Sequence, residues 1–105
     1  MEASLKAKWI EALRSGKYKQ GRLTLRTRND CYCCLGVLCD VSNISKWEVN
    51  GAYYSYDGAL GFLPLSLRDQ LTPEARDYLM QMNDRRDMSF PAIADWIAVH
   101  VEEDQ

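Results

Sequence analysis

The sequence predicts a small α+β domain, in which a small antiparallel sheet of about four short strands carries four to five helices packed on it. Three observations predict it: apolar residues at helical spacing near both ends, alternating runs in the middle, and Asn-Gly and Asp-Gly pairs as turns. The chain has 105 residues, 47% of them hydrophobic and 27% charged, which suits one globular domain over 1–105 and leaves no room for a second core.

The first helix is predicted over about residues 3–15. Leu5 and Trp9 begin an apolar stripe at helical spacing, and charged residues lie between its members. Gly16 follows where a helix often ends in a left-handed residue. Residues 17–21 are predicted to be a polar connector.

A pair of short strands and a buried helix are predicted next. Apolar and polar residues alternate over 22–26, as in a half-buried strand, and Asn29 and Asp30 form a turn pair. Residues 31–33 are predicted to return as a second strand. The apolar run that follows is predicted to be a buried helix over roughly 33–42.

A hairpin is the strongest local prediction in the chain. The β-rich runs 47–49 and 52–54 flank the Asn-Gly pair at 50–51, which is typical of a type I′ turn because both central residues need a positive φ. The Asp-Gly pair at 57–58 predicts another turn.

The second half is predicted to be helical, with its helix starts marked by cap residues. A short helix begins around Pro64, a second is capped by Thr72, and the last is capped by Ser89. The second should end near Asn83 and bury Tyr78, Leu79 and Met82. The apolar stripe of the last helix consists of Phe90, Ile93, Ala94, Ile97 and Val101.

Charge and hydropathy narrow the choice of partners. The formal net charge is -2, which argues against duplex nucleic acid as a partner, although basic residues gather over 17–28 and acidic residues gather in the second half. No apolar run has the length of a membrane span, and the first residues lack the apolar centre of a signal peptide. We therefore expect no membrane partner and a cytoplasmic location.

The four cysteines are expected to be free thiols that pack as small hydrophobic side chains: Cys31, Cys33, Cys34 and Cys39. Their spacing lacks the separated pairs of a zinc site, so we expect no metal ligands and no cofactor. A nucleophilic thiol would need a base, and His100 is the one histidine. We therefore predict no catalytic residue.

An aromatic and basic set is the remaining candidate for chemistry. Trp47, Tyr53 and Tyr54 could stack on a nucleobase, while Lys19, Arg22 and Arg26 could pair with phosphates. Such a set suits a small nucleotide-type ligand. The alternative is that the strand tyrosines pair across the hairpin and cover the core.

Several motifs resemble a widespread, largely uncharacterised family of small phage and prophage proteins. They are W-x3-LRSG-x-Y-x-Q from Trp9, CCLGVLCD from Cys33, L-x3-ND from Leu79 and SF-x2-IAD from Ser89. The resemblance implies a phage-encoded accessory protein made in the host cytoplasm. It also implies a special role for Gln20, Arg26, Asp40, Asn83 and Asp84, either in ligand contact or in capping and bracing the fold.

The aromatic and basic set and the lack of a catalytic pair predict a non-enzymatic protein that binds a nucleotide-type second messenger, cyclic or NAD-derived. The resemblance implies, by analogy with other small phage proteins, that it counters host defence by sequestering this messenger. The candidate ligand-binding residues are Lys19, Gln20, Arg22, Arg26, Trp47, Tyr53, Tyr54, Asn83 and Asp84. We also expect a homo-oligomer, because a thin core leaves apolar surface to cover. Two alternatives stay open: a protein–protein inhibitor of a host defence or replication protein that presents the acidic second half, and a cysteine-dependent enzyme.

Overall fold

The computed structural model describes residues 1–104 and has an α+β fold, as the sequence predicts. Its elements in chain order are α1 (Ala3–Arg14), β1 (Lys19–Gln20), β2 (Arg26–Thr27), β3 (Cys31–Tyr32), α2 (Cys34–Ser42), β4 (Trp47–Asn50), β5 (Tyr53–Tyr56), α3 (Leu65–Arg68), α4 (Pro73–Asp84) and α5 (Phe90–His100). No helix among residues 1–104 is both long enough and apolar enough to cross a membrane.

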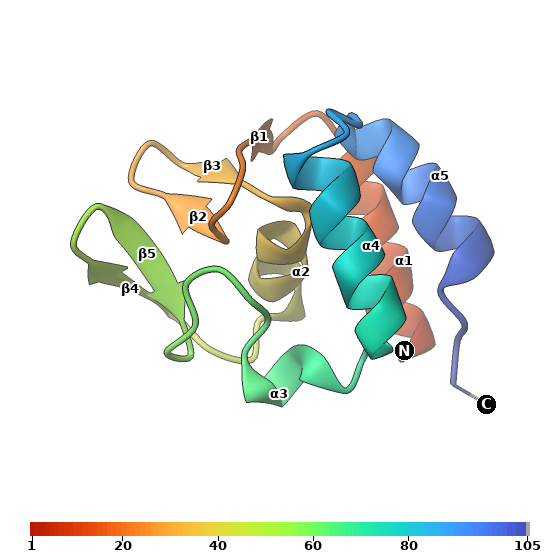
Figure 1. The fold of residues 1–105 in the computed structure, drawn as a ribbon. Coiled ribbons are helices and arrows are strands. Elements are labelled where there is room, and N and C mark those ends of the chain that lie inside the picture. Colours follow the sequence, from red (N-terminus) through yellow and green to blue (C-terminus); the bar gives the residue numbers. More distant parts are fainter. Residues whose placement is uncertain (105) are drawn as a thin grey trace.

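Helices α1, α4 and α5 lie on one side of the molecule and the sheet lies on the other, with α2 between them and the short α3 below (Figure 1). Helix α1 packs against α2 and α5, and α4 packs against the same two helices. Trp9, Leu38 and Ile97 are fully buried at these contacts, and the Trp9 indole donates a hydrogen bond to the Cys34 carbonyl at 2.9 Å. Burial of these side chains supplies the main favourable energy of the fold.

The sheet has five short strands in the order β1-β3-β2-β5-β4, close to the about four predicted, and it departs from the predicted antiparallel sheet in one parallel pair. Strand β1, predicted as a connector, pairs in parallel with β3, and the other neighbours are antiparallel. Gly21 extends this pairing by donating to the Tyr32 carbonyl at 2.7 Å. A side chain on Gly21 would lie 2.8 Å from the Cys31 Cβ, so glycine permits the close approach.

The hairpin forms one residue later than predicted. Asn50 pairs with Tyr53, so the turn residues are Gly51 and Ala52, and Gly51 alone has a positive φ, of 64°. This register places Trp47 opposite Tyr56, with ring centroids 4.9 Å apart. Aromatic pairing across the strands therefore overrides the local preference of Asn-Gly.

The Asp-Gly pair at 57–58 forms the turn that the sequence predicts. Both residues have a positive φ, and Tyr56 and Ala59 exchange two backbone hydrogen bonds across the pair. The predicted helix ends are also confirmed. Thr72 and Ser89 accept backbone hydrogen bonds as N-caps, and Gly16 has φ 76° after α1.

Two predicted placements are wrong. Leu23 does not belong to a strand: its φ is 68°, its side chain is exposed, and β2 begins only at Arg26. Tyr78 does not point into the core, because it lies on the outer side of α4 and is 51% exposed. Leu79 and Met82 are buried as predicted.

The CCLGVLCD string forms the close contact between α2 and the sheet. The Cys33 thiol accepts the Gly36 N–H as an N-cap, and Cys34 and Cys39 are fully buried, which confirms that these cysteines pack as small hydrophobic side chains. A side chain on Gly36 would lie 1.8 Å from the Leu25 carbonyl oxygen. This approach fixes α2 at the start of β2.

Candidate functional site

Five side chains gather on one face of the sheet and are here called the platform: Tyr18, Arg26, Tyr32, Trp47 and Tyr54. Strand β2 is central, since Arg26 lies opposite Tyr32 of β3 and opposite Tyr54 of β5. Side chains at directly opposed positions of an antiparallel pair share a face. The pairing of β2 with β5 therefore brings Arg26 to the rings of the hairpin.

The Arg26 guanidinium lies among three aromatic rings. Its Cζ atom is 4.0 Å from the ring centroid of Tyr54, 5.2 Å from that of Tyr32 and 5.4 Å from that of Trp47. Its Nε and Nη2 both donate to Asp30 Oδ1, at 3.0 and 2.6 Å, and the side chain is 18% exposed. Cation–π attraction and the carboxylate therefore hold the cation in place.

The rings form a continuous edge-to-face row. Centroids are 5.0 Å apart for Tyr18 and Tyr32, 5.9 Å for Tyr32 and Trp47, and 6.5 Å for Trp47 and Tyr54. Burial raises the pKa of Tyr32 to about 12, and burial together with Asp40 raises that of Tyr18. Both phenols are therefore neutral at neutral pH.

Asp40 connects the platform to α2. One carboxylate oxygen accepts a hydrogen bond from the Tyr18 hydroxyl, and the other accepts one from the Trp47 indole N–H at 3.0 Å. The carboxylate thus orients rings from two separate segments. This is a bracing role for the last residue of the CCLGVLCD string.

A second guanidinium reaches the platform from Arg28, two residues after Arg26. Its Cζ lies 5.6 Å from the Tyr54 ring centroid, and its Nη1 donates to the Gly51 carbonyl at 3.1 Å. The sequence-based candidate set lacks both Arg28 and Tyr32. The alternation of side chains along a strand could have suggested Arg28 as a companion of Arg26.

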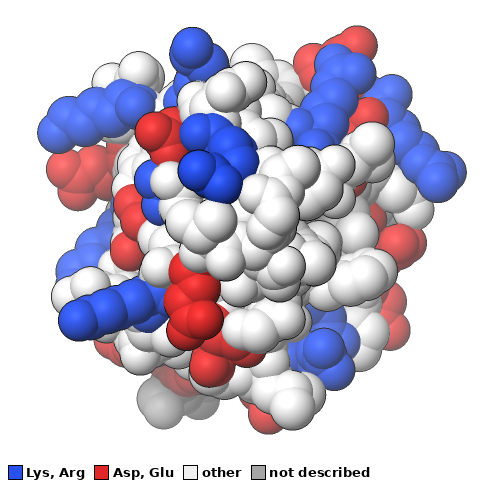
Figure 2. Space-filling view, turned by 90° about the vertical axis from the view of Figure 1, so that its left-hand side faces the viewer, with Lys and Arg blue, Asp and Glu red and all other residues white. Residues whose placement is uncertain are grey.

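A hollow of about 360 Å³ adjoins the platform at Tyr18 and is here called the Tyr18 hollow. It is lined by Lys8, Glu11, Ala12, Ser15, Lys17, Tyr18 and Val41. Neither Lys8 nor Lys17 forms an ion pair within residues 1–104. Figure 2 shows the sheet end of the molecule, where charges of both signs surround an uncharged area, so no single-sign field covers this face.

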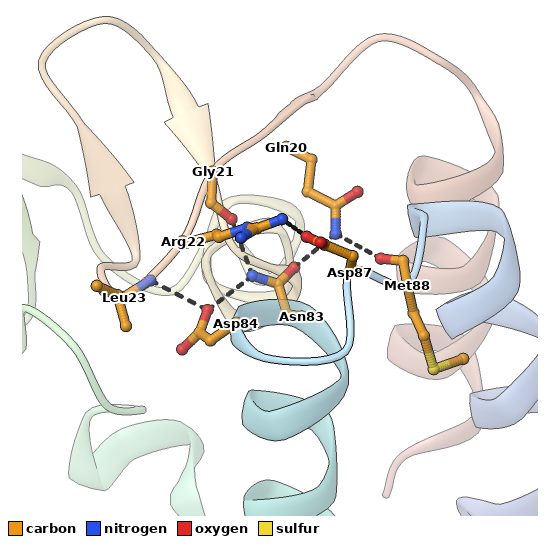
Figure 3. Close-up of polar contacts among 8 residues, drawn as sticks. All are labelled: Gln20, Gly21, Arg22, Leu23, Asn83, Asp84, Asp87 and Met88. Carbon is orange, nitrogen blue, oxygen red and sulfur yellow. Dashed lines mark hydrogen bonds and ion pairs between the residues drawn. The ribbon is translucent and has the colours of Figure 1, made fainter.

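Gln20, Asn83 and Asp84 form a second polar cluster, here called the brace (Figure 3). Asn83 is 1% exposed, and its Oδ1 accepts hydrogen bonds from Gln20 Nε2 at 2.9 Å and from the Cys34 amide at 3.2 Å. Its Nδ2 donates to the Gly21 carbonyl at 2.8 Å and to Asp84 Oδ1 at 2.9 Å. The Asn83 amide is therefore fully satisfied inside the protein.

The rest of the brace is engaged in the same way. Asp84 Oδ1 also accepts the Leu23 amide at 3.0 Å, and Gln20 Nε2 also donates to the Met88 carbonyl at 2.8 Å. These bonds fasten the end of α4 to the segment that leaves β1. The brace thus fits the structural role, in which it stabilises the fold.

The remaining candidates lie apart from the platform. Arg22 forms an exposed ion pair with Asp87, and Lys19 is exposed on the outermost strand, β1. Tyr53 pairs with Asn50 on the face opposite to Tyr54. Of the candidate set, the structure brings Arg26, Trp47 and Tyr54 together in the platform, and Gln20, Asn83 and Asp84 together in the brace.

Three of the cysteines, Cys33, Cys34 and Cys39, lie in a buried environment that suppresses ionisation. Burial raises the pKa of Cys33 to about 12 and raises those of Cys34 and Cys39 well above the ordinary value. A neutral thiol is a poor nucleophile. Within residues 1–104 no group of three or more His, Cys, Asp or Glu side chains is arranged to hold a metal ion.

Fold and site together define a small α+β protein with an arginine-centred aromatic surface. The chain belongs to the family described as "Domain of unknown function (DUF8296)", which matches residues 1–71. The match contains the whole platform and ends before Asn83 and Asp84. No curated protein matches the chain, and no solved structure matches it.

Proposed function

We propose that the protein is a phage-encoded, non-enzymatic accessory protein that binds and sequesters a nucleotide-type second messenger on the platform. The observation that carries the proposal is the Arg26 guanidinium held among the rings of Tyr32, Trp47 and Tyr54. Rings offer stacking surfaces to a base, and a guanidinium has further N–H donors for phosphate beside those that Arg26 gives to Asp30.

The chemistry around the platform suits an anionic ligand with a flat, apolar part. Trp47 and Tyr54 are half-buried, so part of each ring stays accessible, and Arg28 adds an exposed cation beside them. Lys8 and Lys17 line the Tyr18 hollow at the other end of the row. A cyclic oligonucleotide or an NAD-derived molecule combines a base, which the rings could stack on, with phosphates, which the cations could bind.

Binding without cleavage is supported by the lack of an available base or nucleophile on the platform. Its two carboxylates already accept hydrogen bonds, Asp30 from Arg26 and Asp40 from Tyr18 and Trp47. The buried thiols are neutral. General acid–base or nucleophilic catalysis needs such a group within reach of the substrate.

The role in countering host defence, and the host cytoplasm as its place, rest on the resemblance of the CCLGVLCD and neighbouring motifs to small phage proteins. A sequestering protein needs affinity and abundance but no turnover. A single domain with a preorganised surface meets that requirement.

The test is a thermal-shift screen of the purified protein against cyclic dinucleotides, cyclic trinucleotides and ADP-ribose derivatives. We expect one class to raise the melting temperature and to be recovered intact by chromatography after the complex is heat-denatured. A chemically altered product would mean an enzyme. No shift across the panel would contradict the proposal and move the search to a protein partner.

Neighbouring tyrosines supply a matched pair of variants. Tyr54→Ala should weaken binding at least tenfold, because it removes the ring that lies nearest to Arg26. Tyr53→Ala removes a tyrosine from the opposite face and should leave the affinity unchanged. Arg26→Lys keeps the charge but loses the planar fork, and should also weaken binding. Equal losses for Tyr53→Ala and Tyr54→Ala would assign the ligand to another surface.

A further inference from the structure

An exposed apolar surface lies away from the platform and is here called the leucine patch. It consists of Leu23, Leu60, Phe62 and Leu65, which are 75%, 39%, 66% and 78% exposed. Together these side chains expose on the order of several hundred Å², a size at which an apolar surface patch is often functional. The patch shares no residue with the platform.

The members of the patch come from segments that lie against each other. The Leu25 amide donates to the Leu60 carbonyl at 2.7 Å, and a side chain on Gly61 would lie 3.3 Å from the Leu23 carbonyl oxygen. Phe62 and Leu65 line one groove of about 440 Å³, which leads from this contact to the start of α3. The patch therefore joins two segments whose backbones lie against each other, and three of its members, Leu60, Phe62 and Leu65, line the same groove.

Leu23 is held in a conformation that leucine rarely adopts. Its φ is 68°, in the left-handed region that favours glycine. The brace maintains this conformation, because Asp84 accepts the Leu23 amide and Asn83 binds the Gly21 carbonyl next to it. An apolar side chain that is both strained and exposed is unfavourable in an isolated monomer, which points to a function for the position.

We propose that two copies of the chain associate through the leucine patch, face to face. The charged side chains that line the two grooves flanking Phe62 are Asp57, Arg68, Arg76 and Asp77, so each sign is equally represented. The Arg22–Asp87 pair beside Leu23 is also neutral overall. A border with both signs can pair with its own copy in a two-fold contact, whereas a border of one sign would repel it.

The expected dimer forms at high concentration and dissociates on dilution. Two patches with their borders would bury on the order of 1,000 Å², which is the lower end for a specific interface. The test is sedimentation velocity of the full chain from low micromolar to millimolar concentration. We expect a shift from monomer to dimer, and no larger species, because a two-fold contact is closed.

Three variants decide the assignment. Leu23→Gly removes the side chain and relieves the left-handed strain, so dimerisation should weaken at least tenfold while the resistance to urea is unchanged or higher. Phe62→Ser should weaken dimerisation through a different segment. The control is Val99→Ser, which removes another exposed apolar side chain, 77% exposed on α5, and should leave the dimer intact.

The proposal is overturned if the chain is monomeric at every concentration. It is also overturned if the dimer survives both Leu23→Gly and Phe62→Ser, or if Val99→Ser weakens it equally. If the chain stays monomeric and binds only another protein through the patch, the patch is a binding surface for that protein, and the proposal of self-association is overturned.

Discussion

The brace links the sheet to α4 through amide and carboxylate side chains, whereas the platform consists of aromatic rings around Arg26, and the two clusters differ in exposure. In the brace, the Asn83 amide is buried and all its hydrogen-bonding positions are used. In the platform, Trp47 and Tyr54 stay partly accessible, and the exposed Arg28 lies beside them. Burial therefore separates the structural role of the brace from the ligand contact that we propose for the platform.

The largest expected effect comes from Gly36, where α2 meets the start of β2. Gly36→Ala should reduce the free energy of unfolding by more than about 3 kcal/mol, because the new methyl group would overlap the Leu25 carbonyl. Urea unfolding monitored by circular dichroism measures the loss.

Gly16→Ala is the matched control for that substitution. Gly16 has a positive φ but open space around it, so alanine there should cost only about 1 kcal/mol. Equal losses at the two glycines would mean that the close approach at Gly36 is not what fixes α2.

Breaking the brace should lower the free energy of unfolding almost as much as Gly36→Ala does. Asn83→Ala leaves the Cys34 amide, the Gly21 carbonyl and the Gln20 amide without their partner, and we expect a loss of about 3 kcal/mol in urea unfolding. Asn50→Ala on the exposed hairpin is the control and should change stability by less than about 0.5 kcal/mol. A small loss at Asn83 would return this residue to the list of ligand contacts.

Alkaline pH should lower the free energy of unfolding through the buried cysteine thiols. Burial raises the pKa of Cys33 from 9.0 to about 12, so between these values the unfolded state loses the proton that the folded state keeps. The contribution of the buried thiol to the free energy of unfolding is therefore fully present below pH 9. Above pH 9 the free energy of unfolding falls by about 1.4 kcal/mol per pH unit for each such thiol. Melting temperatures from pH 8 to pH 11 measure the fall.

Cys39→Ala tests that cause, since burial raises the pKa of Cys39 as well. Removing this thiol should make the alkaline loss shallower by the contribution of one group. An unchanged slope would assign the loss to other groups.

The smallest effect is expected within the platform. Asp40→Asn keeps the shape but weakens the bonds to Tyr18 and Trp47, at a cost of about 1 kcal/mol. Because Asp40 helps to raise the pKa of Tyr18, this pKa should fall in the variant, as an ultraviolet titration of the phenols would detect. Asp77→Asn, an exposed carboxylate bonded to Gln81, should leave the titration unchanged.

The features that the sequence predicted best are those that short segments determine, such as helix caps and helix ends. The caps at Thr72 and Ser89 and the end of α1 at Gly16 depend on a few adjacent residues, and all three are confirmed. The hairpin register was missed because the pairing of Trp47 with Tyr56 outweighs the local turn preference. Strand β1 was missed because two polar residues that pair with a distant segment carry no periodic signal.

The candidate site was predicted only in part for the same reason. Arg26, Trp47 and Tyr54 meet because β2 pairs with β5, a contact between segments that are far apart in the chain. The sequence alone left open whether Gln20, Asn83 and Asp84 contact a ligand or brace the fold, since burial is a property of the assembled structure.

The most direct test compares one variant of the platform with one variant of the brace. For each variant it measures both the ligand affinity and the free energy of unfolding. Tyr54→Ala should weaken ligand binding at least tenfold and cost only about 1 kcal/mol of stability, since Tyr54 is partly exposed. Asn83→Ala should lower the unfolding free energy by about 3 kcal/mol and, at a temperature where it is folded, bind the ligand with unchanged affinity. If Asn83→Ala loses affinity while Tyr54→Ala keeps it, the brace is the binding site and the platform is structural, which would contradict the account.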